Sequence, residues 1–441
     1  MTAVFSRDLH YQYPLAVRGG GMYLYDQHDR EYLDMCGGAA VSCLGHQHPT
    51  VIAALQEQIS QMAFAHTAFF SNEPQEQLAQ QLVQAFGDEG ARVYFACGGS
   101  EANETAMKFA WQYWRAQNRP TKVKIISRAH SYHGNTFGAL SASGHPARRS
   151  IMGEILLDWP RIDPCYAYRY QQAEETEEEY GIRAAQLLEH TIEREGADTI
   201  AAFIAEPVVG ASLGVVCAAK GYFTKIRAIC DRHDILLIAD EVMCGSGRTG
   251  TFFAHEQESF RPDIVTLAKG LGGGYQPLAA AIVNAKISNL FTKSATGFAH
   301  GHTYAGHAAA CAAGVAVMET INQQNLLAAV RAKGAQLGAQ LTETLSAHPN
   351  VGDIRGRGLF WAIELVQDKA TKTSPYRGAA IAKQLKDTAM RNGLMCYPGG
   401  GDPSQGLNCH ILLAPPYIIE QPHMDQAMTK LTATITEVFG A

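Results

Sequence analysis

The sequence predicts an α/β fold with a mostly parallel central sheet, helices on both of its faces, and a smaller α+β domain built from both ends of the chain. Between about residues 50 and 330, apolar runs of strand length alternate with longer helical stretches. Such alternation of continuous apolar strands with helices is typical of a parallel sheet covered on both faces. The chain has 441 residues, 46% of them hydrophobic, which is enough for a large buried core.

The elements of the central region follow one another in a regular order. The predicted strands are 91–96, 123–127, 199–205, 235–239 and 264–268. The helices predicted around them are 50–62, 75–87, 101–118, 180–195, 222–233 and 305–322. In an open sheet of this kind, ligands bind at the carboxyl ends of the strands, so the functional residues are expected in the loops that follow the strands.

The two ends of the chain have a different pattern. Residues 1–45 have the pattern of short strands and turns, and the region from 330 onward has helices around strand-like runs at 358–366 and 411–414. We therefore predict a large domain at 50–330 and a small domain formed by 1–49 together with 331–441.

Composition excludes several classes of protein. The chain has 36 Lys plus Arg and 42 Asp plus Glu, a formal net charge of −6, whereas nucleic acids and anionic membranes require a basic face. No export signal and no apolar run of about 20 residues is visible. The ten cysteines are scattered without CxxC pairs, so we expect reduced thiols, a cytoplasmic location and no metal site.

A glycine-rich turn follows the first predicted strand. Cys97, Gly98, Gly99 and Ser100 lie between that strand and a good helix opening. Backbone N–H groups and the helix dipole make such a turn suitable for an anion, although a plain turn with Ser100 as the N-cap is about equally consistent. The spacing matches neither G-x-G-x-x-G nor a P-loop, which argues against a nucleotide-binding oxidoreductase.

Two charged residues end apolar strands. Asp240 follows the strand at 235–239, and Lys269 ends the strand at 264–268 and is followed by glycines. Each could be a solvated surface residue, but a desolvated lysine has a lowered pKa and suits Schiff-base chemistry. An anion-binding turn, an acid and a lysine together fit pyridoxal phosphate, which needs a phosphate site, a partner for its pyridine nitrogen and an amine for its aldehyde.

The sequence resembles the class-III pyridoxal-phosphate-dependent aminotransferases, which include amine and ω-amino acid transaminases. The matching stretches are GGSEANE at 98–104, SYHGNT at 131–136, AEPV at 205–208, ADEV at 239–242, GSGRTG at 245–250, KG at 269–270 and HTYAGH at 302–307. They occur in the family's order and span most of the chain. The resemblance implies the fold type I of pyridoxal-phosphate-dependent transferases and a homodimer with active sites at its interface.

The resemblance also implies roles for individual residues. Lys269 would bind the cofactor aldehyde and move the proton, and Asp240 would pair with the pyridinium nitrogen. Tyr132 and Val242 would lie on the two faces of the ring. The remaining cofactor-binding positions would be Gly98, Gly99, Ser100, His133, Glu206 and, from the neighbouring subunit, Thr303. Of these, His133 is expected to be structural or at most near the cofactor.

Two departures from the family bear on the substrate. Many members that bind an α-carboxylate have an arginine shortly before the final Pro-Pro, where this chain has Leu412. Ornithine-type members have a glutamine where this chain has Met243. We expect a roomy apolar pocket, and its candidate residues are Ala40, Val41, Phe69 and Phe70.

These features predict a ping-pong aminotransferase that moves an amino group from an amine or ω-amino acid to a keto acid. The nearest alternative is a class-III racemase or aminomutase, because such isomerases use the same lysine. The sequence does not identify the donor, the acceptor or the stereochemistry.

Overall fold

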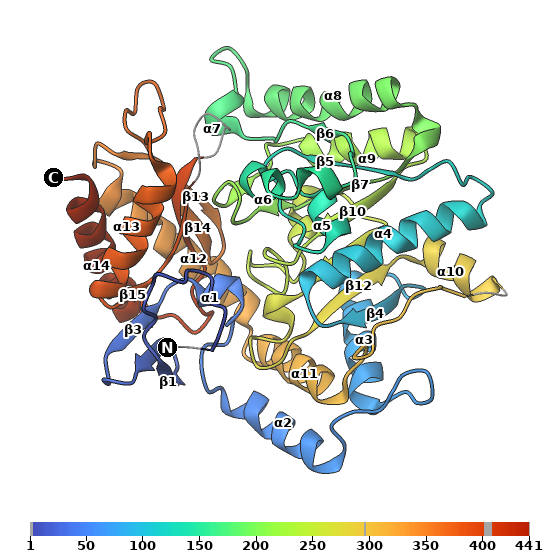
Figure 1. Cartoon of the computed structure of the whole chain (residues 1–441), viewed down its shortest axis with the longest axis horizontal. Coiled ribbons are helices and arrows are strands. Elements are labelled where there is room, and N and C mark those ends of the chain that lie inside the picture. Colours follow the sequence, from blue (N-terminus) through green and yellow to red (C-terminus); the bar gives the residue numbers. More distant parts are fainter. Residues whose placement is uncertain (1–2, 295–296, 401–407, 441) are drawn as a thin grey trace.

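A central sheet, seven-stranded within the described residues, organises the larger part of the molecule (Figure 1). The computed structural model describes residues 3–294, 297–400 and 408–440. In spatial order the strands are β4 (Arg92–Ala96), β12 (Ala279–Val283), β11 (Ile264–Leu267), β10 (Leu236–Asp240), β7 (Ile200–Ala205), β5 (Lys124–Arg128) and β6 (Arg161–Ile162). The pairs from β11 to β6 are parallel, and β12 runs antiparallel to both of its neighbours. The predicted mostly parallel sheet is therefore confirmed.

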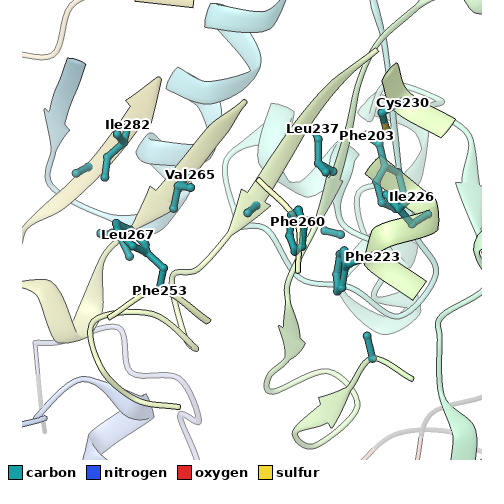
Figure 2. Packing of buried hydrophobic residues seen from close by; sticks show 14 of the residues in the cluster. Phe203, Phe223, Ile226, Cys230, Leu237, Phe253, Phe260, Val265, Leu267 and Ile282 are labelled. Carbon is teal, nitrogen blue, oxygen red and sulfur yellow. The ribbon is translucent and has the colours of Figure 1, made fainter. Parts of the chain in front are cut away.

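Side chains alternate between the two faces of this sheet, as the geometry of a strand requires. On one face, Phe203, Leu237 and Val265 pack against α3 (Glu73–Phe86), α8 (Glu177–Glu195), α9 (Tyr222–Arg232) and α11 (Ala308–Gln323). Figure 2 shows part of this face, with Phe223 and Ile226 of α9 against the strands.

On the opposite face the neighbouring strand residues Ile204, Leu236 and Ile238 pack against a second set of helices. These helices are α4 (Gly99–Ala116), α5 (Phe137–Ala142) and α10 (Ala285–Lys293). Both faces of the sheet are therefore covered, and the ends of its strands are left to form a site.

The two ends of the chain pack together beside this sheet (Figure 1). β1 (Ala16–Gly20), β2 (Tyr23–Asp26) and β3 (Glu31–Asp34) form one sheet with β15 (Leu394–Met395), in which Leu33 is opposite Leu394. A second sheet contains β13 (Val351–Arg357), β14 (Phe360–Leu365), β17 (Cys409–Leu413) and β16 (Tyr397–Gly399), with α12 (Leu326–Leu345), α13 (Gly378–Arg391) and α14 (Gln421–Phe439) around it. One apolar cluster joins residues of both ends. The exact boundaries at 49 and 331 remain predictions.

Several element ends differ from the predicted ones for local reasons. α4 begins at Gly99 rather than 101, because Gly98 takes the extended N-cap conformation. α11 begins at Ala308 rather than 305, because His307 is the N-cap and its side chain accepts a hydrogen bond from the Ala310 N–H. β12 was not predicted, since three of its five residues are alanines, which have low strand propensity.

The remaining elements are short, with the exception of the helix α2. They are α1 (Gly37–Ala40), α2 (Pro49–Gln61), α6 (Pro146–Ser150), α7 (Ala167–Tyr170), β8 (Val208–Val209), β9 (Val216–Cys217) and four 3₁₀ turns, Gly153–Ile155, Ala197–Thr199, Ala254–Glu258 and Lys269–Leu271. Among the described residues, no helix is both long and apolar enough to cross a membrane.

Replacement of a core aromatic residue tests the packing of the sheet. Phe203 is fully buried, so Phe203→Ala is expected to lower the free energy of unfolding by about 3–5 kcal/mol, because it leaves a cavity. Phe5→Ala is the matched control, because Phe5 is 90% exposed, and its effect should stay within about 0.5 kcal/mol. Denaturant unfolding of the two variants measures the difference. Equal stability of both variants would contradict this packing.

Candidate active site

A cavity of about 450 Å³ opens at the carboxyl ends of the sheet strands. Most of the residues that line it lie in segments that follow five different strands, β4, β5, β7, β10 and β11, and Val41 comes from the N-terminal part of the chain. Of the residues predicted for the site, those that line the cavity are Gly98, Gly99, Ser100, Tyr132, His133, Glu206, Asp240, Val242, Lys269 and Val41. The sheet therefore brings together predicted site residues that are up to about 170 positions apart, from Gly98 to Lys269, as an open α/β fold does.

Lys269 lies in the 3₁₀ turn directly after β11 and its side chain lines the cavity. Its backbone has φ of +48°, in the left-handed region that a side chain other than glycine rarely adopts. Burial lowers the pKa of Lys269 to about 8, although the negative charges of Asp240 and Glu206 oppose this change. A share of its amine is therefore neutral near physiological pH, as a nucleophile requires.

Asp240 ends β10, and three donors hold its carboxylate. The backbone N–H of Val242 donates to Oδ1 at 3.0 Å. Asn103 Nδ2 donates to Oδ2 at 2.8 Å, and His133 Nδ1 lies 2.8 Å from the same oxygen. Thr266 Oγ1 donates to Asn103 Oδ1 at 2.8 Å and so fixes the direction of the amide. The carboxylate is held in one orientation at the wall of the cavity.

Glu206 follows β7 and is buried at the same cavity. Burial raises the pKa of Glu206 to about 7, with a smaller contribution from Asp240 and with His133 acting in the opposite direction. Within the described residues, Glu206 Oε2 and His133 Nε2 have no hydrogen-bond partner. Buried polar atoms are normally paired, so two such atoms beside one cavity indicate that a polar ligand belongs there.

The glycine-rich turn opens on the cavity at the N-terminus of α4. A Cβ at Gly98 would meet no atom within 4 Å, so this glycine leaves open space beside the first N–H groups of the helix. A Cβ at Gly99 would lie 2.8 Å from Val242 Cγ1, so only glycine allows Val242 to pack there. Ser100 Oγ accepts a hydrogen bond from the Asn135 N–H at 3.0 Å. Together with the helix dipole, this turn can hold an anion.

The model of the class-III aminotransferase family matches residues 5–435. The chain belongs to the class-III aminotransferases. An uncharacterized aminotransferase of Schizosaccharomyces pombe is 42% identical to it over 432 residues, which are 97% of this chain and 94% of the relative.

Solved structures agree with this assignment. The PMP-bound form of an aminotransferase from Vibrio fluvialis has a TM-score of 0.92 and 33% identity, covering 99% of this chain and 96% of that one. A thermostable (S)-enantioselective ω-transaminase from Thermomicrobium roseum has a TM-score of 0.90 and 36% identity, covering 97% and 93%. The aminotransferase therefore has fold type I and uses pyridoxal 5′-phosphate in amino transfer. The comparisons give no support to the isomerase alternative.

The residues of this aminotransferase fit the cofactor. The open space at Gly98 beside the α4 N-terminus suits a phosphate, and the Asp240 carboxylate suits a protonated ring nitrogen. The buried Lys269 amine suits an aldehyde, and the partnerless atoms of Glu206 and His133 leave polar capacity for the ligand.

Four predicted residues lie outside the cavity of the single chain. Ala40 is buried in an apolar cluster together with Leu412. Phe69 and Phe70 are 80% and 67% exposed, so neither is a core residue of this chain. Thr303 also does not line the cavity, as is expected if it serves a neighbouring subunit. The roles of these four residues remain predictions.

The sequence did not identify several residues that line the cavity. They are Cys97, Asn103, Val208, Ala211, Ala268, Gln276, Pro277 and Leu278. Asn103 could have been found, since it lies one helical turn after Ser100 and therefore on the same face of α4. Gln276, Pro277 and Leu278 precede β12, the strand that the pattern did not predict.

The raised pKa of Glu206 predicts a pH effect on stability. The native state binds this proton more tightly than the unfolded state, so the contribution of Glu206 to stability falls as pH rises from about 4.5 to about 7. For the cofactor-free protein, we expect Glu206→Gln to gain roughly 3 kcal/mol relative to wild type across this range, because glutamine stays neutral. Denaturant unfolding at pH 5 and pH 8 measures the gain.

Glu343→Gln, at an exposed position of α12, is the matched control and should show no such gain. A Glu206→Gln variant whose stability difference from wild type is the same at both pH values would contradict the assignment.

Proposed function

We propose that this class-III aminotransferase moves an amino group from an amine or ω-amino acid to a keto acid in two half-reactions centred on Lys269 and Asp240. The observation that carries the proposal is the convergence of three groups on one cavity. These are a buried lysine with a lowered pKa, a carboxylate held by three donors, and the open N-terminus of α4.

When bound, pyridoxal phosphate supplies an aldehyde that accepts the amino group and a ring that withdraws electrons from the substrate carbon. Lys269 Nζ is the amine that would hold the cofactor and, once a donor amine has displaced it, take the proton from the substrate carbon. Its lowered pKa leaves a neutral amine available for that proton. Asp240 would keep the proton on the ring nitrogen, because its carboxylate is already oriented by Asn103 and His133.

The other site residues would position the cofactor. Tyr132 would stack on one face of the ring and Val242 would pack on the other. The phosphate-binding residues would be Gly98, Gly99 and Ser100, with Thr303 from the neighbouring subunit. The proton on the buried Glu206, whose pKa is raised to about 7, would allow its carboxyl group to donate a hydrogen bond to the cofactor or its neighbours.

The wall of the cavity favours an apolar donor. Val41, Val208, Met243 and Leu278 line it, and Leu412 lies in the apolar cluster that also contains Val208. No arginine is present at position 412 to bind a carboxylate near the reacting carbon. An amine, or an ω-amino acid whose carboxylate is far from its amino group, fits such a wall better than a short α-amino acid.

The assembly is proposed to be a homodimer with active sites at its interface. Exposed aromatic residues gather on the segment around α2 and on the loop before α11. The Phe64 and Tyr304 rings lie 5.6 Å apart, and the exposed Phe69 and Phe70 follow Phe64 closely in the sequence. Burial of such aromatic area against a second copy would be favourable, and it would carry Phe69, Phe70 and Thr303 towards the partner's cavity.

Two further assignments accompany this proposal. The large domain at 50–330 would supply the cofactor site, and the small domain formed by 1–49 and 331–441 would close over it. A cytoplasmic location is supported by the ten cysteines, all of which are free thiols.

Removal of the lysine amine tests the proposed catalytic role. Lys269→Ala is expected to lower turnover at least about a thousandfold, since both the covalent attachment and the proton transfer lose their amine. The visible absorption of the bound cofactor should change at the same time. Lys293→Ala, at an exposed position of α10, is the matched control. Full turnover of Lys269→Ala with an unchanged spectrum would overturn the assignment.

A half-reaction screen tests the proposed donor class. Holoenzyme is mixed with single donors, and the change in cofactor absorption is followed without any acceptor. Apolar amines and long ω-amino acids should react at least about tenfold faster than alanine, because the apolar wall binds their chains. Subsequent amino transfer to pyruvate separates an aminotransferase from an isomerase. Reaction with short α-amino acids alone would contradict the prediction.

A further inference from the structure

The loop that carries Thr303 is held in place by side chains of other elements. Residues 297–307 form neither a helix nor a strand, and they lead into α11, which begins at Ala308. The backbone N–H and C=O groups of such a segment need hydrogen-bond partners outside regular structure. Those partners determine where Thr303, which is exposed in the single chain, is placed.

One face of α4 binds this loop. Thr105, Phe109 and Gln112 are spaced by four and then three positions, so they lie on the same side of the helix. Each of the three contacts a different residue of the segment 298–300. We call these three residues the α4 platform.

Gln112 pairs with the backbone of Ala299 in both directions. Gln112 Nε2 donates to the Ala299 carbonyl at 3.1 Å, and the Ala299 N–H donates to Gln112 Oε1 at 2.8 Å. Next to this pair, the rings of Phe298 and Phe109 stack with their centroids 3.6 Å apart and their planes 10° apart. Two hydrogen bonds and a ring stack therefore fix the loop on the helix.

His300 adds a third contact with the platform. Its Nε2 lies 3.0 Å from Thr105 Oγ1, which itself donates to the Glu101 carbonyl at 2.7 Å. A hydroxyl group has one proton to donate, so His300 Nε2 is the donor in this contact. Burial lowers the pKa of His300 to about 4, so the ring is neutral near physiological pH.

The loop is also fixed on both sides of Thr303. The His302 N–H donates to the Tyr94 hydroxyl at 3.2 Å, and Asn72 Nδ2 donates to the Gly306 carbonyl at 2.9 Å. Thr303 is therefore exposed although the chain around it is fixed. A polar side chain that is already in place binds a ligand without a further cost for its ordering.

α4 connects this loop to a second phosphate site. The helix begins at Gly99, in the turn that the proposed function assigns to the cofactor phosphate of the same subunit. Thr303, in contrast, is assigned to the phosphate of the neighbouring subunit. In the proposed homodimer, each copy of α4 therefore takes part in both cofactor sites.

We propose that the α4 platform of one subunit positions Thr303 and thereby sets the affinity of the neighbouring subunit for the cofactor phosphate. This inference rests on the proposed function. Gln112 is a positioning residue, because it acts through the loop and does not line the cavity. Without its two hydrogen bonds, Ala299 is less restricted, and the loop has to be ordered when the cofactor binds.

Two ligands that differ in the phosphate test the proposal. Full-length protein freed of its cofactor is titrated with pyridoxal 5′-phosphate or with pyridoxal, and the absorption of the lysine-bound ligand is followed. Gln112→Leu should raise the dissociation constant of pyridoxal 5′-phosphate about threefold to tenfold, because two hydrogen bonds to the loop are lost. The dissociation constant of pyridoxal should change by less than about twofold, since pyridoxal has no phosphate for Thr303 to bind. Equal losses with both ligands would overturn the proposal.

Gln117→Leu is the matched control. Gln117 is an exposed glutamine at the C-cap of the same helix. Its substitution removes a side chain of the same type and size but leaves the contacts of the loop unchanged. This variant should bind both ligands as wild type does.

A double variant shows whether Gln112 acts through Thr303. Thr303→Val alone should raise the dissociation constant of pyridoxal 5′-phosphate about tenfold or more, because a hydrogen bond to a charged group is lost. Addition of Gln112→Leu should then change this constant by less than about twofold, since no hydroxyl is left to position. Fully additive effects of the two substitutions would contradict the proposal.

Mixed dimers show which subunit loses affinity. Lys269→Ala removes the amine that holds the ligand, so a dimer with one such subunit reports on its other site alone. When Gln112→Leu is on the Lys269→Ala subunit, the reporting site should lose affinity for pyridoxal 5′-phosphate. When Gln112→Leu is on the reporting subunit, that site should keep the wild-type affinity. The opposite pattern would refute an effect between subunits.

Two further outcomes separate this proposal from the proposed role of Thr303. If Thr303→Val weakens the binding of pyridoxal 5′-phosphate and Gln112→Leu does not, the platform proposal is wrong and the role of Thr303 stands. If Thr303→Val binds both ligands as wild type does, the role of Thr303 at the phosphate is wrong, and the platform proposal is wrong with it.

Discussion

The burial of the Asp240 carboxylate is the constraint around which the site is built. A buried carboxylate is costly unless several donors meet it. Here the donors come from three separate elements: the backbone at Val242, Asn103 on α4, and His133 in the loop after β5. Thr266 on β11 then orients Asn103. The Asp240 carboxylate can be buried only if these elements lie next to one another. Its burial therefore depends on both the strand order and the packing of α4 on the sheet.

Much of the fold could be predicted because the spacing of apolar residues along the chain indicates which side chains are buried. The predicted strands at 199–205 and 264–268 differ by one residue from β7 and β11, since continuous apolar runs mark strands that are covered on both faces. β12 was missed because alanine gives little strand signal. The predicted first residues of α4 and α11 were wrong because the N-cap residues are Gly98 and His307, so the helices begin at Gly99 and Ala308.

The site was only partly predictable, for a different reason. Lys269 and Asp240 could be predicted because a charged residue at the end of an apolar strand is unusual. The order of the family's motifs along the chain supported the same two residues. Asn103 carries no such signal, since its importance comes from contacts with residues far away in the sequence. The proposed roles of Phe69, Phe70 and Thr303 would require a second chain, so the structure of one chain does not test them.

The backbone of Lys269 has a consequence for the evolution of the enzyme. Its positive φ stores strain of about 1–3 kcal/mol, which the surrounding fold must supply. A glycine at this position would relieve the strain and make the protein more stable, but it would also remove the amine. Position 269 is therefore a point of trade-off between stability and activity. Under the proposed catalytic role of Lys269, selection for stability alone would favour glycine at this position, whereas selection for activity would keep the lysine.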